Sequence, residues 1–299
     1  MDRLIASIEG SSDGPLMILV GGIHGNEISG VRAAEDVLNT IMLNSVPLRG
    51  RIVGIRGNLQ ALDQAQRFID EDLNRSWRET SVNEALESPD LNAEKREVVE
   101  ILEFFNDLPV RSHHPKILVD LHSTSSEKGD FIIIPEDESK NPIVKALSLP
   151  IIIDLNKHLE GTLLQYMHDR GYVSFAFEGG AVGTDEAHPL HVSGIWELLF
   201  AACMISEETK NTYSRYDQYI TQHHLQLPKR LSVLYHHRVK PNHNFNMKPG
   251  YHNFMTVKKG EVLAMDRKGE IKAGHDGMIF MPLYQNEGDD GFFIVKKVE

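Results

Sequence analysis

Short apolar runs alternate with longer segments of helical period along the chain as far as Gln222. The runs that predict buried strands cover residues 16–20, 51–56, 117–121, 131–134, 150–154 and 172–177. The segments in which apolar residues recur every three to four positions predict helices, and they cover residues 27–42, 93–105, 159–170 and 186–205. Strands that alternate with helices in this way are typical of an α/β fold with a mixed, largely parallel sheet flanked by helices.

The pattern changes beyond Gln222. From residue 231 onwards the apolar runs are short, glycine and asparagine are frequent, and no helical period remains. This pattern predicts a smaller C-terminal all-β domain, a barrel or a sandwich. We therefore expect an α/β domain over residues 1–224 and a β-rich domain over residues 225–299.

Composition and charge narrow the class of protein. The 299 residues are 41% hydrophobic and 25% charged, which is ordinary for a soluble protein with a sizeable core. No apolar run reaches transmembrane length, the first residues lack a secretory core segment, and a single cysteine, Cys203, excludes an internal disulfide. The formal charge of −12 leaves no basic stripe for phosphates. We expect a cytoplasmic protein with no nucleic-acid and no membrane partner, and a homo-oligomer is left open.

Candidate chemistry begins where the first buried strand ends. His24 and Glu27 follow the run at residues 16–20 with the spacing H-x-x-E, between glycines and the start of a helical segment. At the end of a buried strand, their side chains would project into the crevice where open α/β sheets bind ligands. An imidazole and a carboxylate three residues apart can hold one small cation, and these ligand types suit zinc.

A third candidate ligand ends another predicted strand. His122 directly follows the run at residues 117–121, so it could meet His24 at one edge of a parallel sheet. Two histidines and a glutamate form the ligand set of hydrolytic zinc enzymes. The sequence therefore predicts a zinc site on His24, Glu27 and His122.

Glu178 ends the predicted strand at residues 172–177, just before two glycines. Most glutamates in such positions are helix caps or surface acids. A carboxylate beside activated water could instead act as a general base. The position alone leaves both interpretations open.

The segment at residues 57–77 is polar without being of low complexity, and it carries Arg67, Asp72, Asn74 and Arg75. Arginines in polar loops are usually solvated. However, a guanidinium is suited to bind a substrate carboxylate with two hydrogen bonds, and a second one could polarise a carbonyl. Asp72 could orient a histidine ligand, because such ligands usually donate their other N–H to a carboxylate.

Four stretches together resemble one family. H-G-N-E at residues 24–27, R-F-I-D-E-D-L-N-R at 67–75, D-L-H-S-T-S-S at 120–126 and F-E-G-G at 177–180 are similar, in order and rough spacing, to motifs of the succinylglutamate desuccinylase/aspartoacylase family. That family is related to the zinc carboxypeptidases, so the resemblance implies a zinc-carboxypeptidase-like catalytic domain. It also implies a β-rich second domain that narrows access to the site.

The resemblance implies a role for each motif. It implies one zinc ion per chain on His24, Glu27 and His122, with Asp72 orienting a ligand histidine. It implies Glu178 as general base and acid, Arg67 at the scissile carbonyl, and Asn74 with Arg75 on the α-carboxylate of the substrate. The reaction implied is zinc-dependent hydrolysis of the amide bond of a small N-acyl amino acid.

Two features depart from aspartoacylases. There, an arginine shortly before the catalytic glutamate grips the acidic side chain of the substrate, but neither His168 nor Arg170 aligns securely with it. Aspartoacylases also contribute a C-terminal tyrosine, and here only Tyr284 lies nearby in the sequence. The acyl group and the amino acid of the substrate therefore stay open.

Two alternative functions also stay open. One is a zinc carboxypeptidase acting on short peptides, and the other is a binding protein with a degenerate site.

Overall fold

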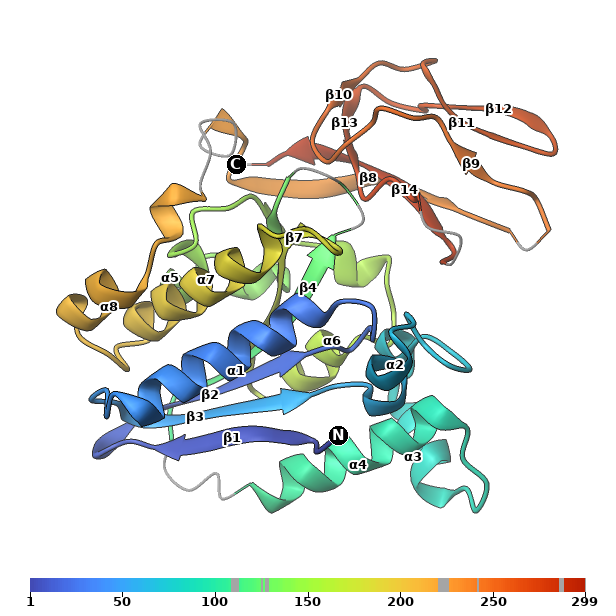
Figure 1. Cartoon of the computed structure of the whole chain (residues 1–299). Coiled ribbons are helices and arrows are strands. Elements are labelled where there is room, and N and C mark those ends of the chain that lie inside the picture. The colour runs from blue at the N-terminus through green and yellow to red at the C-terminus, as the bar shows by residue number, and fades with distance from the viewer. Residues whose placement is uncertain are drawn as a thin grey trace.

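The computed structural model describes residues 1–108, 113–124, 126, 129–219, 226–240, 242–284 and 288–298. Its larger part is an α/β layer structure (Figure 1). The strands of this part are β1 (Leu4–Glu9), β2 (Ser12–Gly21), β3 (Arg49–Arg56), β4 (Lys116–Thr124), β5 (Phe131–Ile133), β6 (Ile151–Ile152) and β7 (Val173–Ala181). The α-helices are α1 (Ile28–Leu43), α2 (Leu59–Gln64), α3 (Glu79–Glu87), α4 (Ala93–Asp107), α5 (Pro142–Lys145), α6 (Leu163–His168), α7 (Ala187–Ala201) and α8 (Glu207–Tyr213). Short 3₁₀ turns lie at Leu73–Arg75, Glu136–Glu138, Leu155–Lys157 and Tyr216–Gln218.

The sheet has the strand order β1-β3-β2-β4-β7-β5-β6 in this part of the chain. Strands β3, β2, β4 and β7 run parallel to one another, while β1 pairs antiparallel with β3 and β5 pairs antiparallel with β7. The expected mixed, largely parallel sheet is therefore confirmed. The parallel strands bring their carboxyl ends to one edge, which is where the candidate ligands lie.

Strand residues alternate between two apolar layers. On β4, Ile117, Val119 and Leu121 join the layer that contains α1 and α7, whereas Leu118 joins the layer that contains α3, α4 and α6. Because side chains alternate along a strand, Asp120 and His122 continue the face of Leu118. The same parity on β7 buries Phe175 and Phe177 beneath α7 and places Glu178 on the face of His122. The hydrophobic pattern thus aims the polar side chains at the strand ends.

The β-rich segment extends the same sheet. Its strands are β8 (Arg230–Arg238), β9 (Asn246–Met247), β10 (Thr256–Val257), β11 (Val262–Asp266), β12 (Gly269–Lys272), β13 (Gly277–Phe280) and β14 (Asp290–Lys297). Strand β8 pairs with β6, and the order continues β8-β14-β13-β10, while β12-β11-β9 form a second sheet. The predicted domain boundary between residues 224 and 225 lies outside the described residues, so the division stays a prediction.

Two predicted elements are only about half as long as expected, or less. Residues 150–154 form a strand only at Ile151–Ile152, and residues 159–170 form a helix only from Leu163. A 3₁₀ turn and Gly161, at φ +75°, interrupt the backbone, and the Thr162 side chain then caps α6 by accepting from the Gln165 backbone N–H. Helix α3 was not predicted, since it lies in a polar stretch with few inward-facing residues.

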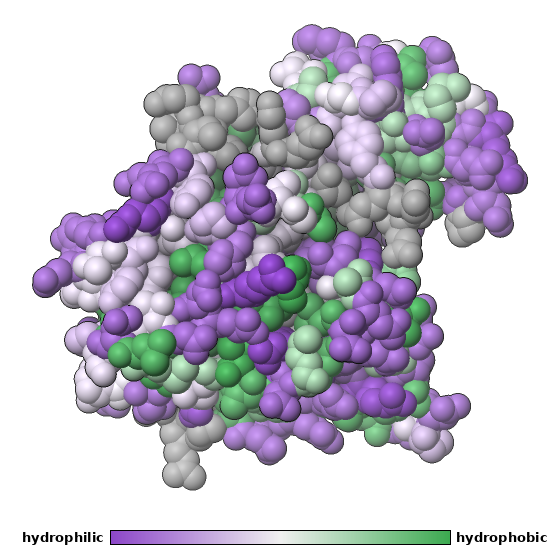
Figure 2. Space-filling model, in the orientation of Figure 1, coloured by the Kyte–Doolittle hydropathy of each residue, from purple (hydrophilic) through white to green (hydrophobic). Residues whose placement is uncertain are grey.

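The face of the molecule drawn in Figure 2 shows more hydrophilic than hydrophobic residues. Figure 2 shows small hydrophobic areas scattered over the face that it draws. Met42 and Leu43, at the end of α1, are among the exposed large hydrophobic residues. In the described part of the chain, no helix has both the length and the apolar character needed to cross a bilayer.

Glycines set the path of the turn between β2 and α1. Gly22 has φ +74°, a region that favours glycine. A Cβ on Gly25 would lie 2.1 Å from the backbone carbonyl carbon of Ala61, so the start of α2 can approach the turn only because this side chain is absent. The glycines therefore bring two backbone segments together beside His24.

We expect Gly25→Ala to destabilise the fold by about 1–3 kcal/mol, because the added methyl would overlap the backbone of α2. Gly274→Ala is the matched control, since a Cβ there meets nothing within 4 Å. The control should change the free energy of unfolding by less than about 0.5 kcal/mol. Urea denaturation of the three proteins measures both values, and equal stabilities would show that the close approach carries no cost.

Candidate active site

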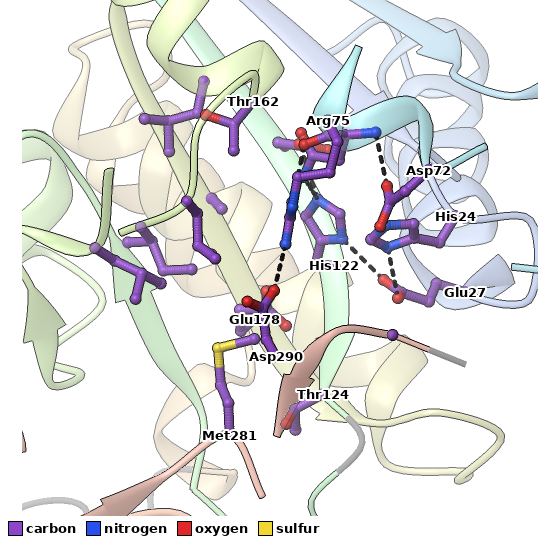
Figure 3. A pocket seen from close by; sticks show the side chains of 18 of the residues that line it. His24, Glu27, Asp72, Arg75, His122, Thr124, Thr162, Glu178, Met281 and Asp290 are labelled. Carbon is purple, nitrogen blue, oxygen red and sulfur yellow. Dashed lines mark hydrogen bonds and ion pairs between the residues drawn. The ribbon is translucent and has the colours of Figure 1, made fainter. Parts of the chain in front are cut away.

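Two chain segments supply the centre of the site. His24 and Glu27 lie in the turn that leads from β2 into α1, and His122 lies near the end of the neighbouring strand β4. All three side chains are buried, at 4% relative exposure each. One potential ligand atom from each lies within 4.8 Å of the other two, which makes them a group able to hold one metal ion (Figure 3).

The carboxylate of Glu27 fixes the two imidazole rings. Nδ1 of His24 lies 2.9 Å from its Oε1, and Nδ1 of His122 lies 2.9 Å from its Oε2. The Ser123 backbone N–H donates to the same Oε2 at 3.0 Å. Burial alone would raise the pKa of Glu27, but His24 and His122 hold that pKa well below its ordinary value. The acid is therefore ionised and faces both Nδ1 atoms.

The far side of each ring is held by another carboxylate. His24 Nε2 lies 3.1 Å from Oδ1 of Asp72, and His122 Nε2 lies 2.9 Å from Oδ2 of Asp120. A proton on Nε2 that is donated to a carboxylate leaves the Nδ1 lone pair free for a cation. The role of Asp120 was not predicted from the sequence. The spacing D-x-H on a strand was the available signal, because residues two apart share a face.

Arg67 and Asp72 lie in the polar segment at residues 57–77, and both contact the candidate ligands. Arg67 Nη1 lies 3.4 Å from Oε1 of Glu27, and Nη2 lies 3.5 Å from Oδ2 of Asp72. Asp72 also caps the turn at Leu73–Arg75 by accepting from the Asn74 backbone N–H at 2.8 Å. Burial would raise the pKa of Asp72, but His24 and Arg67 lower it further than burial raises it. One aspartate thus holds both a histidine ring and the start of the next turn.

Glu178 lies beside His122. The two residues are paired across β4 and β7, and the glutamate side chain is buried against the pocket. Burial raises the pKa of Glu178 to about 7, although the neighbouring His122 acts to lower it. A buried carboxyl with a pKa near neutrality can both accept and return a proton.

Arg75 is bound to a residue far along the chain. Its Nη2 lies 2.8 Å from Oδ2 of Asp290 at the start of β14, and His236 Nε2 lies 2.7 Å from the other oxygen of that aspartate. Burial would lower the pKa of Arg75, but Asp72 and Asp290 raise it, so the guanidinium stays charged. Neither Asp290 nor His236 was predicted, and no spacing in the sequence links residues 75, 236 and 290.

One pocket gathers the predicted site residues. Its lining includes all eight of them, namely His24, Glu27, Arg67, Asp72, Asn74, Arg75, His122 and Glu178. His168, Arg170 and Tyr284 are not part of this lining. Arg170 instead pairs with Glu79 at 2.7 Å and lies over the Tyr166 ring, while the Tyr284 hydroxyl donates to backbone carbonyls of the β-rich segment.

Comparisons with known proteins find relatives of this chain. Residues 13–190 match the family model of the succinylglutamate desuccinylase/aspartoacylase catalytic domain. The chain is 30% identical over 169 residues to a probable aspartoacylase of Prochlorococcus marinus, covering 52% of this chain and 51% of that protein. It is 27% identical over 169 residues to a succinylglutamate desuccinylase of Pseudoalteromonas atlantica, covering 54% of this chain and 48% of that protein. The chain thus spans about half the length of these curated relatives.

A solved structure shows the same fold over a longer stretch. The succinylglutamate desuccinylase/aspartoacylase from Rhodobacter sphaeroides superimposes with a TM-score of 0.71 at 16% sequence identity. This similarity covers 98% of this chain and 88% of that one. It extends the likeness of fold beyond the matched catalytic region and into the β-rich segment.

His191 on α7 supports the site from behind. It is fully buried, and its Nε2–H donates to the backbone carbonyl of His122 at 3.0 Å. Burial lowers the pKa of His191 to about 4, from 6.5 in an unfolded chain. Below pH 6.5 the unfolded chain therefore binds a proton that the folded protein does not bind. His191 must then reduce stability as the pH falls from 6.5 towards 4.

We expect the metal-free protein to lose about 2 kcal/mol of unfolding free energy through His191 between pH 7 and pH 5. His191→Gln keeps a donor for the His122 carbonyl but cannot titrate, so its stability should fall less over the same interval. Urea unfolding of both proteins at the two pH values gives the comparison. If the two losses are equal, His191 does not stay neutral in the folded state.

Proposed function

The chain belongs to the succinylglutamate desuccinylase/aspartoacylase family, and from that premise we propose that it is a zinc-dependent hydrolase that removes the acyl group of an N-acyl amino acid. The observation that carries the proposal is the convergence of His24, Glu27 and His122 in a buried pocket that Glu178 also lines. Two imidazoles and one carboxylate are a ligand set of catalytic zinc sites.

The donor set fits a zinc ion. His24, Glu27 and His122 would hold it, and Asp72 and Asp120 already orient the two rings in the manner usual for zinc-binding histidines. The buried acids also give the site an excess of negative charge, which a divalent cation would balance. When bound, zinc supplies Lewis acidity, which acidifies water and polarises a carbonyl.

Glu178 would transfer the proton, and Arg67 would stabilise the negative charge that develops on the substrate. The Glu178 carboxylate would take a proton from the attacking water and later give it to the departing amide nitrogen. A pKa near 7 suits both steps, because the group can hold or release a proton at neutral pH. The Arg67 guanidinium would donate to the carbonyl oxygen as negative charge develops on it.

Asn74 and Arg75 would bind the α-carboxylate of the substrate. The planar guanidinium offers several donors, and Asp290 holds one of its arms in place. The β-rich segment contributes Met281 and Leu283 to the lining, so it narrows the pocket. A narrowed pocket favours a small substrate over the short peptides of a zinc carboxypeptidase. A panel of dipeptides tests that alternative, because rapid release of the C-terminal residue would support it.

We expect one zinc per chain in the purified protein and almost none in His122→Ala, since two protein ligands hold the ion poorly. Asp120→Asn should keep the fold and weaken zinc affinity about 10–100-fold, because the His122 ring loses the carboxylate that orients it. Metal analysis and chelator competition measure both effects. His188→Ala, which removes a half-exposed histidine of α7 paired with Asp36, is the control. Full zinc occupancy in His122→Ala would exclude His122 as a ligand.

We expect Glu178→Gln to fold and bind zinc but to lose about 10²–10⁴-fold in kcat, because the amide cannot accept the water proton. Glu186→Gln, an exposed carboxylate at the start of α7, should keep the wild-type rate. Steady-state kinetics on N-acyl amino acids, with zinc content measured in parallel, compares them. A rate for Glu178→Gln within a few-fold of the wild type would rule out the glutamate as the general base.

A further inference from the structure

The pocket has an aliphatic part as well as a polar one. Ile133, Leu155, Leu159, Leu164 and Met281 line it in addition to the ionisable residues. Leu155 and Leu159 are almost fully buried and belong to one apolar cluster with Phe131, Phe280 and Phe293. This cluster joins the α/β part to the β-rich segment, so the aliphatic wall rests on packed core rather than on mobile surface loops.

Met281 lies away from the candidate metal ligands. In the view of Figure 3, Asp290 lies between Met281 on one side and His24 and Glu27 on the other. Arg75 and Asp290 are 215 positions apart in the chain, and their side chains pair at 2.8 Å in the lining of the pocket. A molecule held at the metal ligands and at Arg75 would therefore extend its remaining part towards aliphatic side chains.

The arginines of the pocket are already balanced by acids. Among the described lining residues, Arg67 and Arg75 are the ones that carry a positive charge at every pH of interest. Arg67 faces Glu27 and Asp72, and Arg75 is paired with Asp290. Asp289, which also lines the pocket, adds a further negative group on the side of Arg75.

A substrate with two carboxylates would fit this arrangement poorly. Its α-carboxylate can use Arg75, but a second carboxylate placed in the aliphatic part would meet Leu155, Leu159 and Met281, with the acids Asp289 and Asp290 on the side of Arg75. A buried carboxylate without a cation or donor keeps its full desolvation penalty. An alkyl group in the same place gains from leaving water. The pocket should therefore discriminate against the second charge.

We propose that the preferred substrates are N-acyl amino acids with a single carboxylate, whose remaining group is uncharged and apolar and lies against the wall formed by Leu155, Leu159 and Met281. The inference rests on the proposed deacylase function and names its substrate class. According to this inference, neither a succinyl acyl group nor an acidic amino-acid side chain is preferred. This holds whether the acyl half or the amino-acid half of the substrate enters the aliphatic part.

Matched substrate pairs test the proposal on the zinc-loaded wild-type protein. One pair is N-acetyl-L-leucine against N-acetyl-L-aspartate, and the other is N-pentanoyl-L-leucine against N-succinyl-L-leucine. In at least one pair, the kcat/KM of the apolar compound should be at least about tenfold higher than that of the acidic compound. In the other pair, the acidic compound should not be preferred. A preference for the acidic member of either pair, or equal rates in both, would overturn the inference.

Binding separates this inference from the proposed function. Calorimetry with zinc-loaded Glu178→Gln measures the Kd of each intact compound without turnover. If none of the compounds is hydrolysed by the wild type, the deacylase function fails. The ranking of the Kd values then still decides the inference, since tighter binding of the acidic compounds would refute it and tighter binding of the apolar ones would support it.

A charge placed on the wall gives a second test. Met281 is half-buried and lines the pocket, and lysine is close to methionine in length. Met281→Lys should shift the ratio of kcat/KM values towards the acidic member of at least one of the two substrate pairs by at least about tenfold. Met281→Gln, of similar length but uncharged, should shift neither ratio. Unchanged ratios for both pairs in a folded Met281→Lys protein would overturn the inference. The wild-type panel remains decisive if that variant does not fold.

Discussion

The carboxylate of Glu27 is the contact on which the rest of the site depends. It lies buried between two imidazole rings, within 2.9 Å of an Nδ1 atom of each, and accepts a third contact from the Ser123 backbone. An ionised carboxylate at this depth is unstable unless positive charge faces it. In the metal-free protein, the two imidazole rings face the carboxylate and lower its pKa, and in the loaded protein a divalent cation would supply positive charge. The acid thus couples β2, α1 and β4 at a single point.

A second set of carboxylates contacts the histidine rings on the side away from Glu27. Asp72 and Asp120 hold the outer nitrogens of the rings, and Asp72 also caps the turn that carries Asn74 and Arg75. The orientation of the rings is therefore linked to the placement of the residues proposed to bind substrate. Since side chains that orient metal ligands commonly change metal affinity, each of these acids should act on both metal binding and the geometry of the pocket.

The β-rich segment completes the pocket rather than merely adjoining it. Asp290 bridges Arg75 and His236, and Met281 contributes to the aliphatic wall. The sheet passes without interruption from β6 to β8, so these residues are fixed by backbone pairing and by the apolar cluster around Phe131. The residues at the strand ends can therefore keep their arrangement while this segment sets the shape of the rest of the pocket.

The sequence by itself determined the alternation of strands and helices and the residues at the strand ends. His24, Glu27, His122 and Glu178 each end or follow an apolar run, and the local period of two fixes the face on which such side chains lie. The tertiary structure alone decided that Arg75 meets Asp290, which is 215 positions away. It also decided that β5 runs antiparallel to β7 and that Met281 packs against the same cluster as Leu155 and Leu159. Local sequence patterns carry no information on such pairs, because packing between distant segments selects them.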